Sequence, residues 1–150
     1  MLTTHHKNLA AIIHLSTLTK FFIPLGNFII PIILWMTNKD KSDFVDAHGK
    51  QAINFQLSIL IYTIFIICLT IPLFLFGVLN SVSFPEFWHA YDFDFNISHR
   101  DGFNVVLFTI LAVILAAAAF IFEIIFVIIA TTKANQGEPY KYPITINFLK

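Results

Sequence analysis

The sequence predicts an all-α, polytopic integral membrane protein, and two long uncharged stretches are the main reason. Residues 51–85 contain no charged side chain, and between residues 103 and 132 only Glu123 is charged. A helix needs about 20 apolar residues to cross the ~30 Å hydrocarbon core of a bilayer, so each stretch is long enough for one span. The composition agrees, because 57% of the 150 residues are hydrophobic and 12% are charged, whereas a soluble domain carries about 25% charged residues. We expect a single membrane domain over residues 1–150.

The first two apolar segments, about residues 9–23 and 28–37, are separated by the tetrapeptide Pro24–Asn27. Proline removes a helical hydrogen-bond donor and glycine accepts positive φ, so one helix should end here and another begin, with Asn27 as its N-cap. Each segment is too short to cross a bilayer comfortably, and the two together are too long for one upright span. We therefore expect a short or re-entrant helical hairpin. One broken, tilted span is the alternative.

Two longer helices are expected over about residues 43–79 and 102–132. The loop between them, residues 80–101, has four carboxylates against one arginine, whereas residues 38–50 and the tail 133–150 each carry three lysines. Since positive charge is retained on the cytoplasmic side, the loop should lie outside and both lysine-containing segments in the cytoplasm. The expected location is the bacterial cytoplasmic (inner) membrane, with several passes.

The C-terminal tail changes its hydrophobic period. Apolar and polar residues alternate from Tyr142 to Phe148, and this two-residue period is typical of extended backbone rather than of helix. A single strand has no obvious partner in this chain. We expect an extended segment that lies on the membrane surface or against the helices.

Polar residues follow one face of the third helix. At 100° per residue they fall within an arc of about 160°. Lipid would penalise these side chains, so they should face protein or a wet vestibule. They either hold the helices together through hydrogen bonds or line a path for a substrate or ion. The residues of this polar stripe are Asp46, Lys50, Gln51, Asn54, Ser58 and Tyr62.

Lys20 and Glu123 are the two lone charges expected inside the membrane. In a hairpin, Lys20 lies about 18 Å along its helix from the cytoplasmic end, and Glu123 lies about 15 Å from Lys133. Similar depth allows an ion pair, which would offset much of the cost of burying two charges. Alternatively, Lys20 extends to the interface and Glu123 is protonated or bonded to the stripe.

Other features narrow the class of function. Lysine plus arginine equals aspartate plus glutamate at nine each, which argues against a nucleic-acid partner. None of the six histidines has metal-ligand spacing with another, although His14 and His48 both lie near the expected cytoplasmic boundary. Cys68 is the only cysteine, and the chain contains no phosphate loop, nucleophile elbow or dinucleotide fingerprint. We expect no metal, no cofactor and no catalytic residue.

Three sequence motifs resemble a known group. They are His14-Leu15-Ser16, the stretch from Asp46 to Gln56 that begins Asp-Ala-His-Gly-Lys, and Lys133-Ala-Asn-Gln-Gly-Glu138. The chain resembles a bacterial membrane family labelled domain of unknown function 4870. That family is grouped, more distantly, with the twenty-kilodalton inner-envelope subunit of the chloroplast protein-import translocon. The resemblance implies a four-segment membrane domain and transfers no catalytic residue.

The sequence therefore predicts a non-enzymatic inner-membrane protein that is a subunit or accessory of a membrane assembly. Protein translocation or envelope maintenance follows from the distant resemblance. The alternative is a small oligomeric channel or carrier whose path is lined by the third helix. The expected partners are the lipid bilayer and either another membrane protein or further copies of the chain. The candidate functional residues are His14, Lys20, Asp46, His48, Lys50, Gln51, Asn54 and Glu123.

Overall fold

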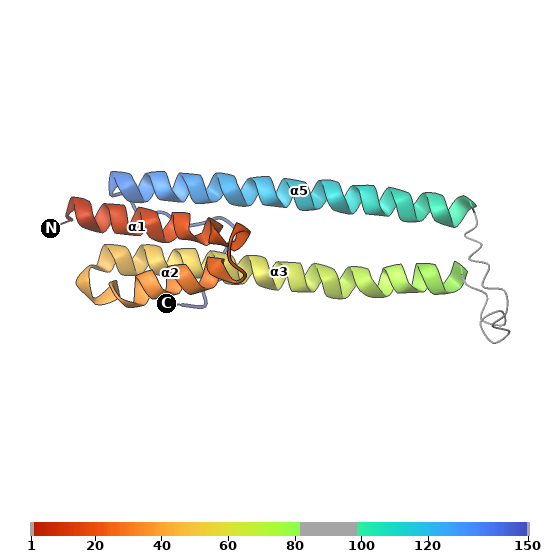
Figure 1. Cartoon of the computed structure of the whole chain (residues 1–150), viewed down its shortest axis with the longest axis horizontal. Coiled ribbons are helices and arrows are strands. Elements are labelled where there is room, and N and C mark those ends of the chain that lie inside the picture. The colour runs from red at the N-terminus through yellow and green to blue at the C-terminus, as the bar shows by residue number, and fades with distance from the viewer. Residues whose placement is uncertain (1, 82–98, 150) are drawn as a thin grey trace. The chain divides into compact units, whose positions relative to one another are not determined.

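The computed structural model describes residues 2–81 and 99–149, and helices are the only regular elements within them. The elements are α1 (Thr4–Ser16), the 3-10 helix η1 (Thr17–Phe21), α2 (Gly26–Met36), the 3-10 helix η2 (Lys39–Lys41), α3 (Asp43–Ser81) and α5 (His99–Gln136), as Figure 1 shows. The all-α prediction is confirmed for these residues. The loop expected over residues 80–101 falls mostly outside the described residues.

Two helices are long and apolar enough to cross a membrane. The qualifying segments are Asp43–Pro72 of α3 and Thr109–Gln136 of α5. The chain divides into two compact units, which we call the bundle unit (Met1–Tyr62 with Phe120–Lys150) and the apolar unit (Thr63–Ala119). Among the residues whose side chains the structure describes (2–72, 106–107 and 109–149), every buried one belongs to the bundle unit.

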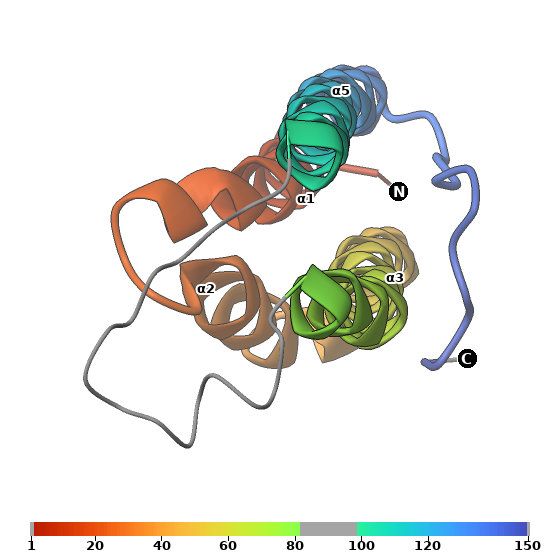
Figure 2. The same ribbon diagram turned by 90° about the vertical axis from the view of Figure 1, so that its right-hand side faces the viewer.

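The first two segments form the expected helical hairpin. Helices α1 and α2 pack against each other, and η1 with a tight turn connects them (Figures 1 and 2). Gly26 permits this turn, since a Cβ there would lie 2.7 Å from Thr19 Oγ1 and 3.0 Å from the Thr19 carbonyl carbon. The N-cap prediction was wrong: the cap is Leu25, at φ 60°, and Asn27 lies inside α2. The Asn27 side chain has another role, described below.

Small and branched side chains hold the bundle unit together in three apolar clusters. The first contains Ala10, Ala11 and Ala134; the second contains Ile13, Val45 and Ala52; the third contains Phe55, Val127, Ala130 and Tyr142. Each cluster contains at least one alanine, and these small side chains allow close approach of the helix backbones. The clusters connect α1, α3, α5 and the tail, so these four segments form one packed unit.

The tail, residues 138–149, has no regular secondary structure and runs beside the part of α3 in the bundle unit (Figure 2). Of the two placements expected for it, the one against the helices is found. The predicted alternation does not persist, because Ile144 adopts a left-handed φ of 57° at a turn. Tyr142 is therefore buried at 2% exposure, whereas Ile144 is 80% exposed.

Candidate functional site

A hydrogen-bonded row of three buried rings connects α1, α3 and the tail. His14 Nε2 lies 2.8 Å from His48 Nδ1, and His14 Nδ1 lies 2.9 Å from the Tyr142 hydroxyl. Tyr142 also stacks on Phe55, with ring centroids 4.0 Å apart and planes at 9°. The stacking holds the tyrosine ring where its hydroxyl reaches the imidazole. His14 and His48, which the sequence placed near one boundary, are thus brought into direct contact.

Burial keeps His14, the middle ring of this row, and Tyr142, at one end of it, uncharged. Burial, with a smaller contribution from His48, lowers the pKa of His14 from its usual 6.5 to about 3. Burial also raises the pKa of Tyr142 well above 10, and Tyr140 and Glu123 add to that shift. At neutral pH, His14 is therefore a neutral imidazole and Tyr142 keeps its hydroxyl proton.

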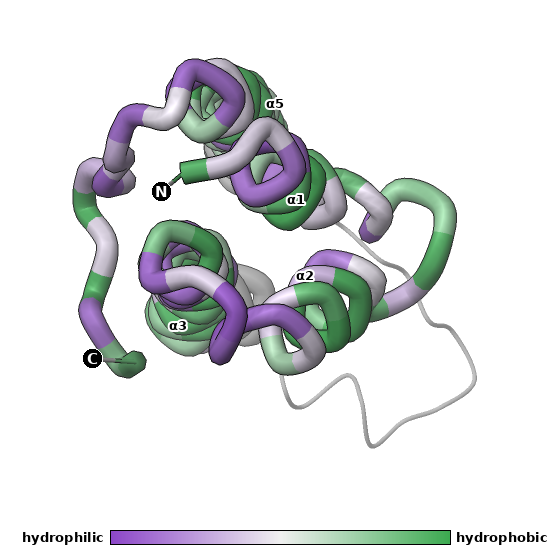
Figure 3. Tube along the Cα trace, turned by 90° about the vertical axis from the view of Figure 1, so that its left-hand side faces the viewer, coloured by the Kyte–Doolittle hydropathy of each residue, from purple (hydrophilic) through white to green (hydrophobic). Residues whose placement is uncertain are grey.

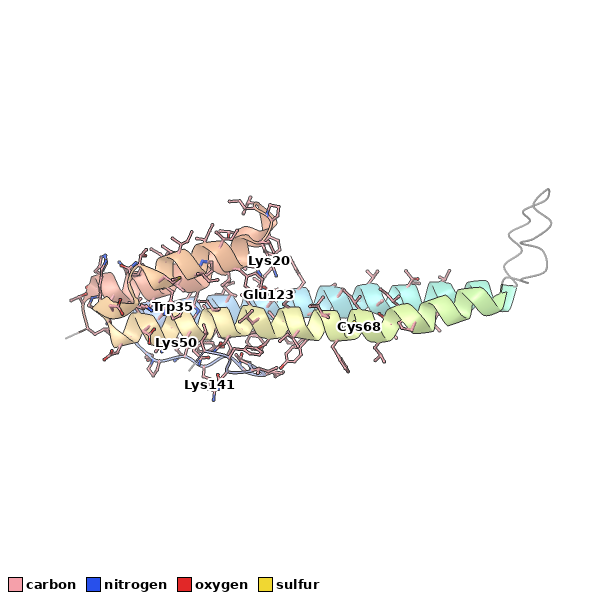
Figure 4. The ribbon with its side chains drawn as sticks, turned by 90° about the horizontal axis from the view of Figure 1, so that it is seen from below. Lys20, Trp35, Lys50, Cys68, Glu123 and Lys141 are labelled. Atoms are coloured by element: carbon pink, nitrogen blue, oxygen red, sulfur yellow. The ribbon has the colours of Figure 1, made fainter. Side chains whose placement is uncertain are left out.

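A second polar network surrounds Glu123 in α5. Lys20 Nζ donates to both carboxylate oxygens of Glu123 at 2.5 Å, and Figure 4 shows the two side chains pointing toward one another. Gln56 Nε2 also donates to Glu123, at 3.3 Å, while Gln56 Oε1 accepts from Asn27 Nδ2 at 2.8 Å. The predicted ion pair is confirmed. Four elements, η1, α2, α3 and α5, therefore meet at one carboxylate.

The C-terminal half of the polar stripe, which begins at Asn54, binds the tail rather than another helix. Asn54 donates to the Leu149 carbonyl at 3.0 Å and accepts from the Leu149 N–H at 2.9 Å. The remaining two contacts are Ile146 N–H donating to Ser58 Oγ at 2.9 Å and the Tyr62 hydroxyl donating to the Ile144 carbonyl at 2.8 Å. All three side chains contact tail backbone, so this recognition does not depend on the tail's side chains.

The N-terminal half of the stripe, from Asp46 to Gln51, connects α3 to α2 through a hydrogen bond. Asp46 pairs with Lys50 at 2.6 Å and accepts a hydrogen bond from Trp35 Nε1 at 2.8 Å. Gly49 makes room for this indole, because a Cβ there would lie 2.2 Å from Trp35 Cδ1. Gln51 differs from its neighbours: its buried Oε1 has no hydrogen-bond partner within the described residues.

Two participants, Gln56 and Tyr142, were not among the predicted site residues. Gln56 projects about 160° away from the middle of the stripe at 100° per residue, so a search along one helical face omits it. The available signal was a third amide in the same helix, placed on the face opposite to Gln51 and Asn54. Tyr142 could not be found from spacing, because it lies 128 positions from His14.

The chemistry available here is that of a polar core. No group of three metal-ligating side chains occurs within residues 2–81 and 99–149. The His14 nitrogens point to two different neighbours and do not converge on a common ion. The Lys20–Glu123 pair, to which the Gln56 amide donates, can hold two opposite charges inside the bundle unit at reduced cost.

Comparison with known proteins corrects the earlier resemblance. No curated protein and no solved structure matches the chain. The sequence model that does match, over residues 5–149, is that of the MamF/MmsF family, described as the magnetosome magnetite crystal formation protein family. The assignment to domain of unknown function 4870, and with it the link to the chloroplast import subunit, was wrong. Its motifs lie where the helices pack, and four apolar segments are a layout that unrelated membrane proteins share. The chain belongs to the MamF/MmsF family.

Proposed function

We propose that this chain is a non-enzymatic, multi-pass protein of the magnetosome membrane that takes part in magnetite crystal formation. The observation that carries the proposal is the family match over residues 5–149. The two apolar helices support insertion in a bilayer. A scaffold role is favoured over a carrier path along α3, because Asn54, Ser58 and Tyr62 are already bonded to the tail.

The surface of the hairpin supports its entry into the membrane from the cytoplasmic side. Its tip is apolar, with Phe22 88% and Leu25 66% exposed. The opposite end, where α2 joins α3, is hydrophilic (Figure 3). A hairpin with an apolar tip and a polar base is suited to re-entrant insertion, because its tip gains from burial in hydrocarbon.

In the proposed orientation, the acidic loop lies on the side of the membrane where the crystal grows. A segment outside the cytoplasmic membrane becomes luminal when that membrane invaginates to form a compartment. The four carboxylates of this region, which we call the loop carboxylates, are Glu86, Asp92, Asp94 and, in the first turn of α5, Asp101. Carboxylate oxygens are hard ligands that suit hard cations, ferric iron among them. The proposed role is therefore to present carboxylates to iron or to the growing crystal from a rigid membrane anchor.

Thiol labelling of isolated magnetosomes, whose exposed face is cytoplasmic, tests the orientation. In a Cys68→Ala background, a membrane-impermeant reagent should label Asp40→Cys at once and Asp92→Cys only after detergent is added. Immediate labelling at position 92 with none at position 40 would show the opposite orientation.

A charge-neutral loop tests the role. The four loop carboxylates are changed to their amides in a magnetite-forming bacterium that lacks the native protein. Crystal size or number, measured by electron microscopy, should differ from wild type. The matched control is Asp40→Asn with Asp43→Asn, two carboxylates near the cytoplasmic end of α3, and it should leave the crystals unchanged. Normal crystals with the amide loop would refute the role.

A further inference from the structure

An open pocket of about 670 Å³ lies between the first turns of α3 and two arms of the tail. Phe44, Ala47, Tyr140 and Leu149 are among the residues that line it. The polar side chains that line it include His48, Gln51, Lys50 and Lys141. The pocket lies entirely within the bundle unit and is distinct from the Lys20–Glu123 network.

The direction of the hydrogen bonds in the ring row determines what His48 presents to this pocket. Neutral His14 makes two hydrogen bonds in this row, one with the Tyr142 hydroxyl and one with His48. If the Tyr142 hydroxyl donates to His14 Nδ1, the His14 proton is on Nε2 and donates to His48 Nδ1. The reverse order would leave the buried tyrosine hydroxyl without an acceptor, which is costly. His48 therefore carries its proton on Nε2.

His48 is 2% exposed, and its Nε2 has no partner at hydrogen-bonding geometry in the described part of the chain. The Glu138 backbone lies near this ring as a weak hydrogen-bond acceptor, but the contact does not reach full hydrogen-bonding geometry. Three residues further along α3, Gln51 Oε1 is a buried acceptor without a partner. The two residues that carry this unsatisfied donor and this unsatisfied acceptor thus line the same pocket, and such buried groups normally have partners.

The charges around the pocket select the ligand. Asp46 and Lys50 neutralise each other as an ion pair, so Lys141 leaves the lining with one net positive charge. Figure 4 shows Lys50 on α3 and Lys141 on the tail that runs along it. A phosphodiester carries one negative charge and accepts hydrogen bonds, while a headgroup hydroxyl can donate to Gln51. The apolar residues that line the pocket suit the glycerol and upper acyl chain.

We propose that this pocket binds the headgroup of an anionic phospholipid at the cytoplasmic face. The phosphate accepts from His48 Nε2 and contacts Lys141, and the headgroup hydroxyl donates to Gln51 Oε1. This inference rests on the proposed membrane orientation, which places the start of α3 at that face. Binding there would anchor the tail to the bilayer as well as to α3.

Native mass spectrometry of the full chain in mild detergent tests the site, with dioleoylphosphatidylglycerol as the titrated probe. Wild type should retain one lipid. Lys141→Ala and Gln51→Leu should each weaken retention about ten-fold, because a hydrogen bond to a charged group is lost or a polar partner is removed. The matched control is Lys39→Ala, which removes the same charge from the same side but does not line this pocket, and it should bind like wild type.

Equal retention by all four proteins would identify non-specific lipid around the helices and overturn the proposal. Displacement of the lipid by inorganic phosphate would show a free-phosphate site instead and would overturn it too. Lys141 is exposed, so Lys141→Ala should keep its fold, and an unchanged melting temperature checks this. Failure of lipid binding would leave the thiol-labelling result intact, so the two proposals can fail separately.

Discussion

The bundle unit and the apolar unit contain parts of the same two helices but differ in what those helices bury. In the bundle unit, α3 buries Asn54, Gln56 and Ser58 at 1% exposure or less. In the apolar unit, α3 exposes large apolar side chains such as Phe65, at 68%, and α5 does the same with Leu115, at 61%. A helix that is apolar on all sides is typical of a membrane span. The buried polar side chains of these helices therefore occur in the bundle unit, where neighbouring segments supply hydrogen-bond partners. The parts of α3 and α5 in the apolar unit have a surface suited to lipid.

The largest loss of stability is expected on substitution of Glu123, because this buried carboxylate of the bundle unit is paired with a charge. Glu123→Ala leaves Lys20 without its carboxylate and Gln56 without an acceptor, and should lower the free energy of unfolding by about 3 kcal/mol or more. Denaturant titration in detergent measures this. Ile114→Ala, at a 59% exposed site in the apolar unit, is the control and should cost far less.

Exchanging the charges of Lys20 and Glu123 tests whether this ion pair itself stabilises the bundle unit. Lys20→Glu and Glu123→Lys should each destabilise the protein, and the double variant should recover part of the loss because the opposite charges are restored. Purely additive losses would mean that the two side chains do not interact in the membrane-bound protein.

Acid should destabilise the bundle unit through His14, which lies in α1 outside the two candidate spans. The folded-state pKa of about 3 is below the unfolded value of 6.5, so the unfolded chain binds the proton first. Stability is therefore lost as the pH falls below 6.5 and continues to fall toward 3. This group alone should reduce the free energy of unfolding by about 2 kcal/mol between pH 7 and pH 5.

The His14→Gln variant isolates that contribution. The ring is faced by His48 from α3 and by Tyr142 from the tail, and the variant retains both. Its stability should depend less steeply on pH between 7 and 5 than that of wild type. Identical slopes would show that His14 titrates normally and is not buried as a neutral ring.

A smaller effect is expected where the tail binds α3. Asn54→Leu removes two hydrogen bonds to the Leu149 backbone and should cost about 1–3 kcal/mol. Carboxypeptidase should also shorten the tail faster, because its end is no longer held. Unchanged digestion would show that the stripe does not retain the tail.

Lys50→Ala should have the smallest effect among these variants. Lys50 and Asp46 form a half-exposed pair four residues apart on α3, and such pairs contribute only a few tenths of a kcal/mol. Asp46 keeps its bond to Trp35 in the variant. A loss of stability as large as that of Asn54→Leu would contradict the expectation that the Asp46–Lys50 pair contributes less than the bonds of Asn54 to the tail.

The family assignment shows how far local patterns can mislead. The motif around His48 and Gly49 led to one bacterial family, while the match over residues 5–149 belongs to another. In the structure, Gly49 accommodates Trp35 and His48 contacts His14. Both are requirements of helix packing, so similar residues can recur in membrane proteins with different roles.

The sequence by itself determined the features that depend on neighbouring residues. Uncharged stretch lengths predicted the two long helices, the break at Pro24–Asn27 predicted the hairpin, and helical rise placed Lys20 level with Glu123. These follow from 1.5 Å per residue and from the cost of burying charge. Only the tertiary structure decided where the tail runs. Its period of two ends at Ile144, whose left-handed φ turns the backbone onto the polar stripe and buries Tyr142 beside His14. Contacts between residues 128 positions apart depend on that turn and on packing, and neither is encoded in a local period.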